Sequence, residues 1–210
     1  MKPDSWNFEK AAAKNGFACI AGVDEAGRGP LAGPVVAASV ILPSFVSITG
    51  LDDSKKLTLS QRDRLYPQIY AHAVSVGIGV IGPYIIDRIN ILQASLQAMA
   101  LAVNSLCPRP DYLLIDGNFS IPSALPQQTI IKGDSLSASI AAASVVAKVT
   151  RDRLMQKHHQ DYPQYEFARH KGYPTKMHKE SIRTFGISLI HRRSYKGVRE
   201  YCTNTRNTEV

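Results

Sequence analysis

The chain has 210 residues, enough for one domain or for a domain with a small appendage. Its 25 lysines and arginines outnumber 17 acids, and the net charge of +8 suits a polyanionic partner, although a basic surface kept for solubility is also common. No apolar run reaches the ~20 residues of a membrane span, and no signal core is present, so we expect a cytoplasmic protein without membrane contact. Cys19, Cys107 and Cys202 are too far apart for a Cys-x-x-Cys pair, which argues against zinc and a disulfide framework.

Two apolar strands joined by a glycine-containing loop are predicted near the N-terminus. Residues 17–23 and 34–42 are apolar runs of strand length on either side of that loop. The Thr-x-x-Gln spacing at residues 58–61 is that of a capping box, and it predicts a helix that continues to about His72. A third strand is expected over residues 73–81, where three glycines weaken the pattern.

The middle of the chain alternates helices and strands. Apolar residues spaced four and three apart from Ile85 to Leu106 predict a helix with one buried face, ending near Pro108. A coiled coil is the competing interpretation, but the run is short and its flanks are not charge-patterned. Residues 112–115 and 129–131 are predicted strands, and a long helix follows, from about residue 137 to 158.

These elements together indicate an α/β protein in which helices cover a mixed sheet. Alanines on the long helix would permit close packing against that sheet. The composition becomes polar, aromatic and basic after about residue 161. We therefore predict a main domain over residues 1–160 and a small C-terminal helical region over residues 161–210, which can also pack as part of the same domain. Residues 203–210 are expected to form a frayed tail.

Four acids share one context, since each follows an apolar strand and precedes a glycine-containing turn or a helix: Asp24, Glu25, Asp116 and Asp134. If the strands are neighbours, the carboxylates converge at one edge of the sheet, where repulsion would raise their pKa values unless a cation relieved it. Mg²⁺ and Mn²⁺ prefer such oxygen ligands. Because neighbouring residues of a strand alternate between faces, either Asp24 or Glu25 must sit past the strand end, or bind through its carbonyl or a water.

A structural role competes with this metal site for each acid taken singly. Acids are usually surface residues or helix caps, and Asp134, just before a helix, suits a cap well. The coincidence of three strand ends with a glycine loop and a basic charge favours a metal site. Two metal ions held there can activate a water on one side of a phosphate and stabilise the leaving oxygen on the other.

Several blocks resemble bacterial ribonuclease HII, in the order that this family has them. The most distinctive is DEAGRGPLAGPVV at residues 24–36. The others are DSKKL at 53–57, DGN at 116–118, KGD at 132–134, AAASVVAKVTRD at 141–152, HKGYPT at 170–175 and HRRS at 191–194. The resemblance covers about residues 17–196. Arg28 in the loop, and too little chain for an extra N-terminal domain, favour this type over the related ribonuclease HIII.

The resemblance implies a ribonuclease H-like fold with a mixed five-stranded sheet flanked by helices. It implies a metal-dependent endonuclease that cuts the RNA strand of RNA–DNA hybrids and cuts 5′ of single ribonucleotides in duplex DNA, leaving 3′-hydroxyl and 5′-phosphate ends. It also implies that Mg²⁺ or Mn²⁺ is bound by Asp24, Glu25, Asp116 and Asp134. The rivals are another nuclease of this fold that cuts DNA, and a catalytically silent nucleic-acid-binding module.

Substrate contacts are expected along the same blocks. Gly27 and Gly29 would let the backbone approach a 2′-hydroxyl in a shallow minor groove, and Arg28 would pair with the adjoining phosphate. The resemblance places Tyr173 beside the sugar of the next nucleotide, although a tyrosine between glycine and proline can simply pack on the domain. Further candidates are Lys56, Asn118, Ser144 and Lys148.

Some alternatives stay open. Lys148 is four residues from Asp152 on the predicted helix and can form an ion pair with it instead of binding substrate. The six histidines lack zinc-like spacing. Arg192 and Arg193 are expected to be surface charges that can contact a nucleic-acid backbone. We expect a monomer, and the C-terminal tail is a candidate contact for a replication protein.

Overall fold

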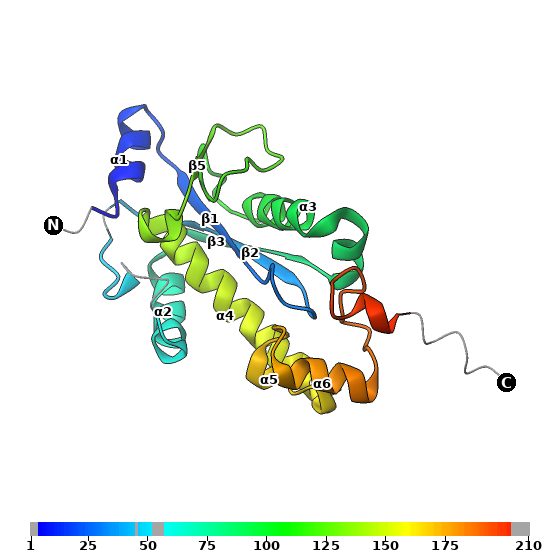
Figure 1. Ribbon diagram of the computed structural model, residues 1–210. Coiled ribbons are helices and arrows are strands. Elements are labelled where there is room, and N and C mark those ends of the chain that lie inside the picture. The colour runs from blue at the N-terminus through cyan, green and yellow to red at the C-terminus, as the bar shows by residue number, and fades with distance from the viewer. Residues whose placement is uncertain (1–3, 45, 52–56, 203–210) are drawn as a thin grey trace.

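A computed structural model describes residues 4–44, 46–51 and 57–202. Its centre is one five-stranded sheet in the order β3-β2-β1-β4-β5 (Figure 1). The strands are β1 (Ile20–Ala26), β2 (Val35–Ile41), β3 (Ser75–Ile81), β4 (Tyr112–Asp116) and β5 (Gln127–Ile130). Strand β1 pairs antiparallel with β2 and parallel with β4, which confirms the prediction of a mixed sheet. Among the described residues, no helix combines the length and apolar character needed to span a bilayer.

Helices cover both faces of this sheet, so β2 at its interior is apolar nearly throughout, whereas the edge strand β5 is largely polar. Helix α3 (Pro83–Asn104) packs on one face against β3, β2 and β1. Helix α4 (Ala138–Asp161) lies on the opposite face, with α2 (Leu59–His72) beside it (Figure 1). Every residue of β2 is buried, as expected for a strand that is covered on both sides.

Close contact between α4 and β1 depends on small residues. The Gly22 backbone lies so near the Ser139 and Ile140 backbone that a Cβ built on Gly22 would come within 2.1 Å of the Ser139 carbonyl carbon. The alanines of α4 that were predicted to permit such packing are buried: Ala138, Ala141, Ala142, Ala143 and Ala147. The helix that carries Ser144 and Lys148 is therefore held directly against the strand that carries Asp24.

The predicted helices are present, with one interruption. Thr58 and Gln61 form the expected capping box at the start of α2, and that helix ends at His72 as predicted. Helix α3 is not continuous, because Asn90 has a φ of 67° within it. The Asn90 side chain accepts a hydrogen bond from the Gln93 amide at 3.1 Å and so caps the second part of the helix. The apolar spacing continues across the kink, which is why the sequence predicts one helix.

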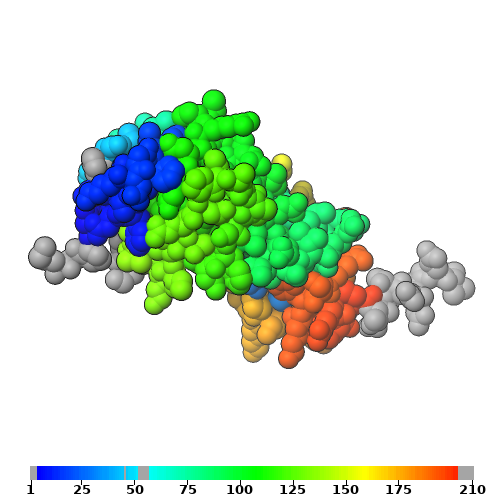
Figure 2. Space-filling view, turned by 90° about the horizontal axis from the view of Figure 1, so that it is seen from above, coloured from blue at the N-terminus to red at the C-terminus, as the bar shows by residue number. Residues whose placement is uncertain are grey.

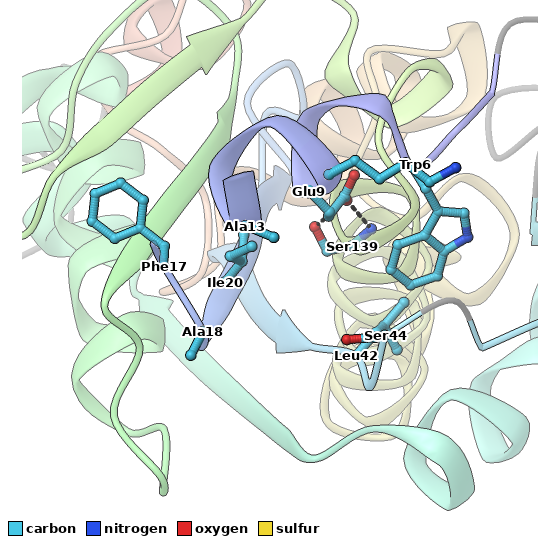
Figure 3. Close-up of a pocket in the computed structure, with 10 residues that line it drawn as sticks. Trp6, Glu9, Ala13, Phe17, Ala18, Ile20, Leu42, Ser44 and Ser139 are labelled. Carbon is cyan, nitrogen blue, oxygen red and sulfur yellow. Dashed lines mark hydrogen bonds between the residues drawn. The ribbon is translucent and has the colours of Figure 1, made fainter. Parts of the chain in front are cut away.

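Helix α1 (Asn7–Lys14) is fastened to the start of α4 by a buried acid. The Glu9 Oε1 atom accepts hydrogen bonds from the Ser139 amide and hydroxyl at 3.0 and 2.7 Å (Figure 3). It also accepts one from the Ser137 hydroxyl at 2.6 Å. A hollow of about 310 Å³ lies beside Glu9, between Trp6 and Phe17. Its described lining includes none of the four predicted metal ligands, so we regard it as separate from the candidate site.

The C-terminal segment packs at one end of the molecule, opposite α1 (Figure 2). It contains η3 (Pro163–Tyr165), α5 (Phe167–His170), α6 (Lys176–Phe185) and η4 (Arg199–Tyr201). One apolar cluster joins Phe167 and Ile182 of this segment to Leu31 and Met155 from the rest of the chain. The boundary predicted near residue 160 stays a prediction, and the predicted tail lies outside the described residues.

Candidate active site

Of the alternatives considered for Asp24 and Glu25, a position past the strand end is excluded, whereas binding through a carbonyl or a water stays a prediction. Strand β1 runs to Ala26, because its hairpin with β2 pairs Asp24 with Ala38 and Glu25 with Ala37. Alternation then puts the two acids on opposite faces. Asp24 faces the Ser144 hydroxyl of α4, and Glu25 lies towards α3 in a small hollow of about 70 Å³.

Asp116 ends β4, next to these acids. Strands β1 and β4 are parallel neighbours, and Val23 is paired with Ile115, so the next residues along are Asp24 and Asp116. Burial raises the pKa of Asp24 well above its ordinary value of 3.8, and the charges of Glu25 and Asp116 add to the effect. Burial also raises the pKa of Glu25, although Arg28 opposes the shift. Three carboxylates therefore share one electrostatic environment.

Asp134 does not follow a strand directly, because β5 ends at Ile130. It lies in η2 (Gly133–Ser135) and is 4% exposed. The amide of Gly133 donates to Asp116 Oδ1 at 2.6 Å, which ties this turn to β4. The cap of α4 is Ser137, which accepts from the Ile140 amide, so the described geometry does not give Asp134 the capping role considered above.

The donor set suits a hard divalent cation, because all four groups are carboxylates. The raised pKa values of Asp24 and Glu25 express first the cost of burying these charges and then their nearness to Asp116, and a cation would relieve both. Within the described ranges, however, no three or more His, Cys, Asp or Glu side chains are gathered closely enough to hold an ion as they stand. Mutual repulsion is a physical reason for carboxylates to stay apart when no cation is between them.

The Gly27-Arg28-Gly29 loop is supported from below by a buried arginine. Arg192 is fully buried and donates to the carbonyls of Gly27 at 2.6 Å, Arg28 at 2.9 Å and Gly33 at 3.0 Å. The prediction that Arg192 is a surface charge is therefore wrong. Its planar guanidinium can donate hydrogen bonds to several carbonyls at once, and these bonds offset the free-energy cost of removing the charge from water. Arg193 is exposed, as predicted, and its backbone amide donates to the Asp87 carboxylate.

A second buried guanidinium, Arg151 of α4, completes this support and was missed by the sequence analysis. It donates to the carbonyls of Pro34 at 3.0 Å, Lys171 at 3.0 Å and Ala32 at 3.2 Å. Burial, with the nearby charge of Arg192, lowers the pKa of Arg151 to about 10, so the group stays cationic at neutral pH. One signal for the burial of Arg151 was available in the sequence. Arg151 lies four residues after Ala147 and four before Met155, so it shares a helix face with two buried apolar residues.

These contacts set the direction of the loop amides. In a planar trans peptide the C=O and the following N–H point in opposite directions. The carbonyls of Gly27 and Arg28 point inward to Arg192, so the amides of Arg28 and Gly29 point away from it. Gly27 has a φ of +104°, which favours glycine, and a Cβ there would lie 2.2 Å from Arg151 Nε. The loop therefore presents N–H donors on its outer side.

The outer side borders a hollow of about 330 Å³ in which most of the predicted substrate residues meet. Its described lining includes six of them: Gly27, Arg28, Gly29, Ser144, Lys148 and Tyr173. Asn118 is exposed and lines the smaller hollow with Glu25, Arg28 and Asp116. Lys56 lies outside the described residues.

Two of the cations in the larger hollow are already paired. Arg28 contacts Glu25 at 3.3 Å, and its side chain is 50% exposed. Lys148 Nζ contacts Asp152 Oδ1 at 2.7 Å, which is the alternative left open by the spacing. Its Nζ also lies 5.7 Å from the centre of the Tyr173 ring. Ion pairs at such partly exposed positions contribute little to stability, so both cations can exchange partners at low cost.

A chain of neutral histidines holds Tyr173 in this wall. The Ser188 amide donates to His191 Nδ1 at 2.9 Å, so the proton of His191 is on Nε2 and is donated to His178 Nε2 at 3.0 Å. His178 must then donate from Nδ1 to the Tyr173 carbonyl at 2.9 Å. Burial is the main reason why the pKa of His178 falls to about 4 and that of His191 to about 3. Both rings are therefore neutral at neutral pH.

The strand order, with acids on the two central parallel strands, places the chain in the class of ribonuclease H-like α/β proteins. Two solved structures have this architecture. A ribonuclease H2 from Pyrococcus horikoshii is 28% identical, with a TM-score of 0.73 over 88% of this chain and 97% of that one. A ribonuclease HII from Archaeoglobus fulgidus, solved in a complex with PCNA, is 25% identical, with a TM-score of 0.70 over 85% of this chain and 96% of that one.

Sequence comparison identifies the family. The model of the family Ribonuclease HII matches residues 21–198. A Ribonuclease HII from Geobacter sulfurreducens is 56% identical over 205 residues, which cover 98% of this chain and 94% of the relative. A second relative, from Geobacter metallireducens, is 57% identical over 93% of this chain and 92% of its own length. The chain belongs to the ribonuclease HII family.

Proposed function

We propose that this chain is a divalent-metal-dependent endonuclease that hydrolyses the RNA strand of RNA–DNA hybrids and cuts 5′ of single ribonucleotides in duplex DNA, leaving 3′-hydroxyl and 5′-phosphate ends. The observation that carries the proposal is the meeting of two features. Asp24, Glu25 and Asp116 share one electrostatic environment, and they adjoin a loop whose amides face outward. Family membership supports the same activity.

Asp24, Glu25, Asp116 and Asp134 would hold the metal, which is Mg²⁺ or Mn²⁺ on the preference of both ions for carboxylate oxygens. When bound, two such ions supply Lewis acidity towards the phosphate and lower the pKa of water. Asp24 and Asp116, on adjacent strands, are suited to hold an ion between them. Glu25, on the opposite face of β1, would serve a second position, for which it must exchange its contact with Arg28.

The loop and Tyr173 would supply the preference for ribose. The amides of Arg28 and Gly29 are placed as donors to a 2′-hydroxyl and its neighbouring phosphate, and a 2′-hydroxyl is what distinguishes RNA from DNA at one position. The Tyr173 ring lies close to Gly29, where a Cβ would be in contact with Tyr173 Cε1 at 3.8 Å, so the ring and the loop form one continuous wall of the hollow. A nucleotide whose sugar reaches the loop amides would place its neighbour's sugar against this ring.

The test uses a labelled DNA duplex carrying one ribonucleotide, with Mg²⁺ or Mn²⁺. We expect a single cut on the 5′ side of the ribonucleotide, and no cut in an all-DNA duplex of the same sequence. Replacing Asp24 by Asn should remove nearly all turnover while hybrid binding stays largely intact. Cutting of plain DNA would support a DNA nuclease of this fold, and binding without any cut would support a silent binding module.

A contact with a replication protein is a separate part of the proposal. The Archaeoglobus relative was solved with PCNA, and the tail of this chain, residues 203–210, is the candidate segment here. Its test is a comparison of the full chain with one that lacks residues 203–210, measured for binding to the sliding clamp of the same cell. Equal binding by both would rule out the tail.

A further inference from the structure

The hollow beside the glycine loop has a third cation, Arg62, which belongs to α2 and to none of the blocks considered above. It is in the first turns of the helix that begins after Thr58, and it lines the same hollow as Arg28 and Tyr173. Helix α2 is held in this place by Leu65 and Ile69, which pack in the same apolar cluster as α4. Arg62 is therefore fixed relative to Ser144 and Lys148.

Arg62 differs from the other two cations in its partners. Within the described part of the chain, its guanidinium makes one hydrogen bond, from Nη1 to the Leu57 carbonyl at 2.6 Å, and no ion pair. Its Nε is buried and has no acceptor there. Arg28 and Lys148, in contrast, each contact a carboxylate. A guanidinium with unused donors on the wall of a polar hollow costs stability unless an acceptor reaches it.

The place of Arg62 at the start of α2, and the shape of its guanidinium, also favour binding of an anion. The N-terminal end of α2 carries a partial positive charge, and this adds to the charge of Arg62. Two N–H groups of a guanidinium can donate in parallel to two oxygens of a phosphate. The hydrogen bond from Arg62 to the Leu57 carbonyl orients the guanidinium, and because a carbonyl is neutral the positive charge is not compensated.

We propose that Arg62 binds a backbone phosphate of the nucleic acid and so extends the substrate-binding surface from the glycine loop across to α2. The proposal rests on the proposed function, since it names a further contact for the same duplex. Arg62 lines the same hollow as Glu25 but is not one of the four acids expected to hold the metal, so we assign it to binding and register rather than to the chemical step.

The chain offers a matched control in Arg64. It lies two residues further along α2, so it does not share the Arg62 face, and it is exposed. Arg62→Gln, Arg62→Lys and Arg64→Gln are each made in the full chain carrying Asp24→Asn, and binding to a labelled RNA–DNA hybrid is measured from 50 to 200 mM KCl. Melting temperatures of all variants confirm that each is folded.

We expect Arg62→Gln to weaken binding roughly tenfold and to lower the slope of log affinity against log salt by about one, as the loss of one phosphate contact does. Arg62→Lys should keep most of the slope, and Arg64→Gln should change affinity less than twofold. An unchanged slope in a folded Arg62→Gln variant would overturn the proposal, as would equal effects of Arg62→Gln and Arg64→Gln. Because binding alone is measured, failure to cut hybrids would refute the proposed function and leave this result standing.

Discussion

Replacing Gly22 by Ala tests the link between the α4–β1 contact and the site. The new Cβ would lie 2.1 Å from the Ser139 carbonyl carbon and 2.3 Å from the Ile140 nitrogen, whereas ordinary contact begins at 3.4 Å. Both neighbours are backbone atoms inside or beside α4, so no rotamer change can relieve the overlap. The helix must move away from the strand by about 1.3 Å.

The magnitude follows from that displacement. Overpacking a core costs 1–3 kcal/mol, and a backbone clash belongs at the upper end, so we expect a loss of about 3 kcal/mol. For a chain of this size the melting temperature should fall by roughly 6–12 °C. Because α4 carries Ser144 opposite Asp24, a shift of this size should also lower the rate of cutting about 100-fold at a temperature where the variant is folded.

The assay combines thermal unfolding, followed by circular dichroism, with cleavage of the single-ribonucleotide duplex. Gly82→Ala is the control, since Gly82 is extended at φ −76° and a Cβ there meets nothing within 4 Å. As a change at a helix N-cap, it should cost less than about 1 kcal/mol. The reasoning is refuted if Gly22→Ala melts within 2 °C or so of the wild type, because then α4 would not have had to move.

Two further predictions concern ionisable groups. The raised pKa of Asp24 means that the folded chain binds its proton more tightly than the unfolded chain, so the wild type loses stability as pH rises from the ordinary value of 3.8 through the raised one. Without metal, Asp24→Asn should therefore melt higher than the wild type at pH 8 and lose this advantage towards pH 4; a lower melting temperature at pH 8 would contradict the sign. His178→Ala should raise KM for the single-ribonucleotide duplex roughly fivefold, the equivalent of one hydrogen bond to Tyr173. His178→Asn, whose amide nitrogen takes the place of Nδ1, should restore most of it, and equal KM values for the two variants would exclude the positioning role.

Much of the fold was predictable because its signals are local. The capping box of α2, the apolar strands and the alanines of α4 each follow from a few neighbouring residues. The kink at Asn90 was not predictable from periodicity, since the apolar spacing is the same on both sides. The place of Asp24 and Glu25 within β1 depends on how far the hairpin with β2 extends, and apolar content alone does not reveal that length.

The acids and the loop of the candidate site were predictable as residue types, but the support beneath them was not. Arg151 and Arg192 bind backbone carbonyls of residues more than a hundred positions away, with the exception of Lys171. A carbonyl is present at every residue, so no pattern of side chains marks the partner. The sequence analysis placed Arg192 on the surface because arginines without a carboxylate partner usually lie there.

The contact between Arg192 and the glycine loop also has a consequence for synthesis of the chain. The loop is made first, and the guanidinium that turns its carbonyls inward is made 165 residues after Gly27. At synthesis rates of roughly 5–20 residues per second, about 8 to 30 s separate the two. During that interval the acids are present while the loop has not yet taken its final form. A nascent chain is therefore expected to be unable to select a substrate until Arg192 has been made and has reached the loop.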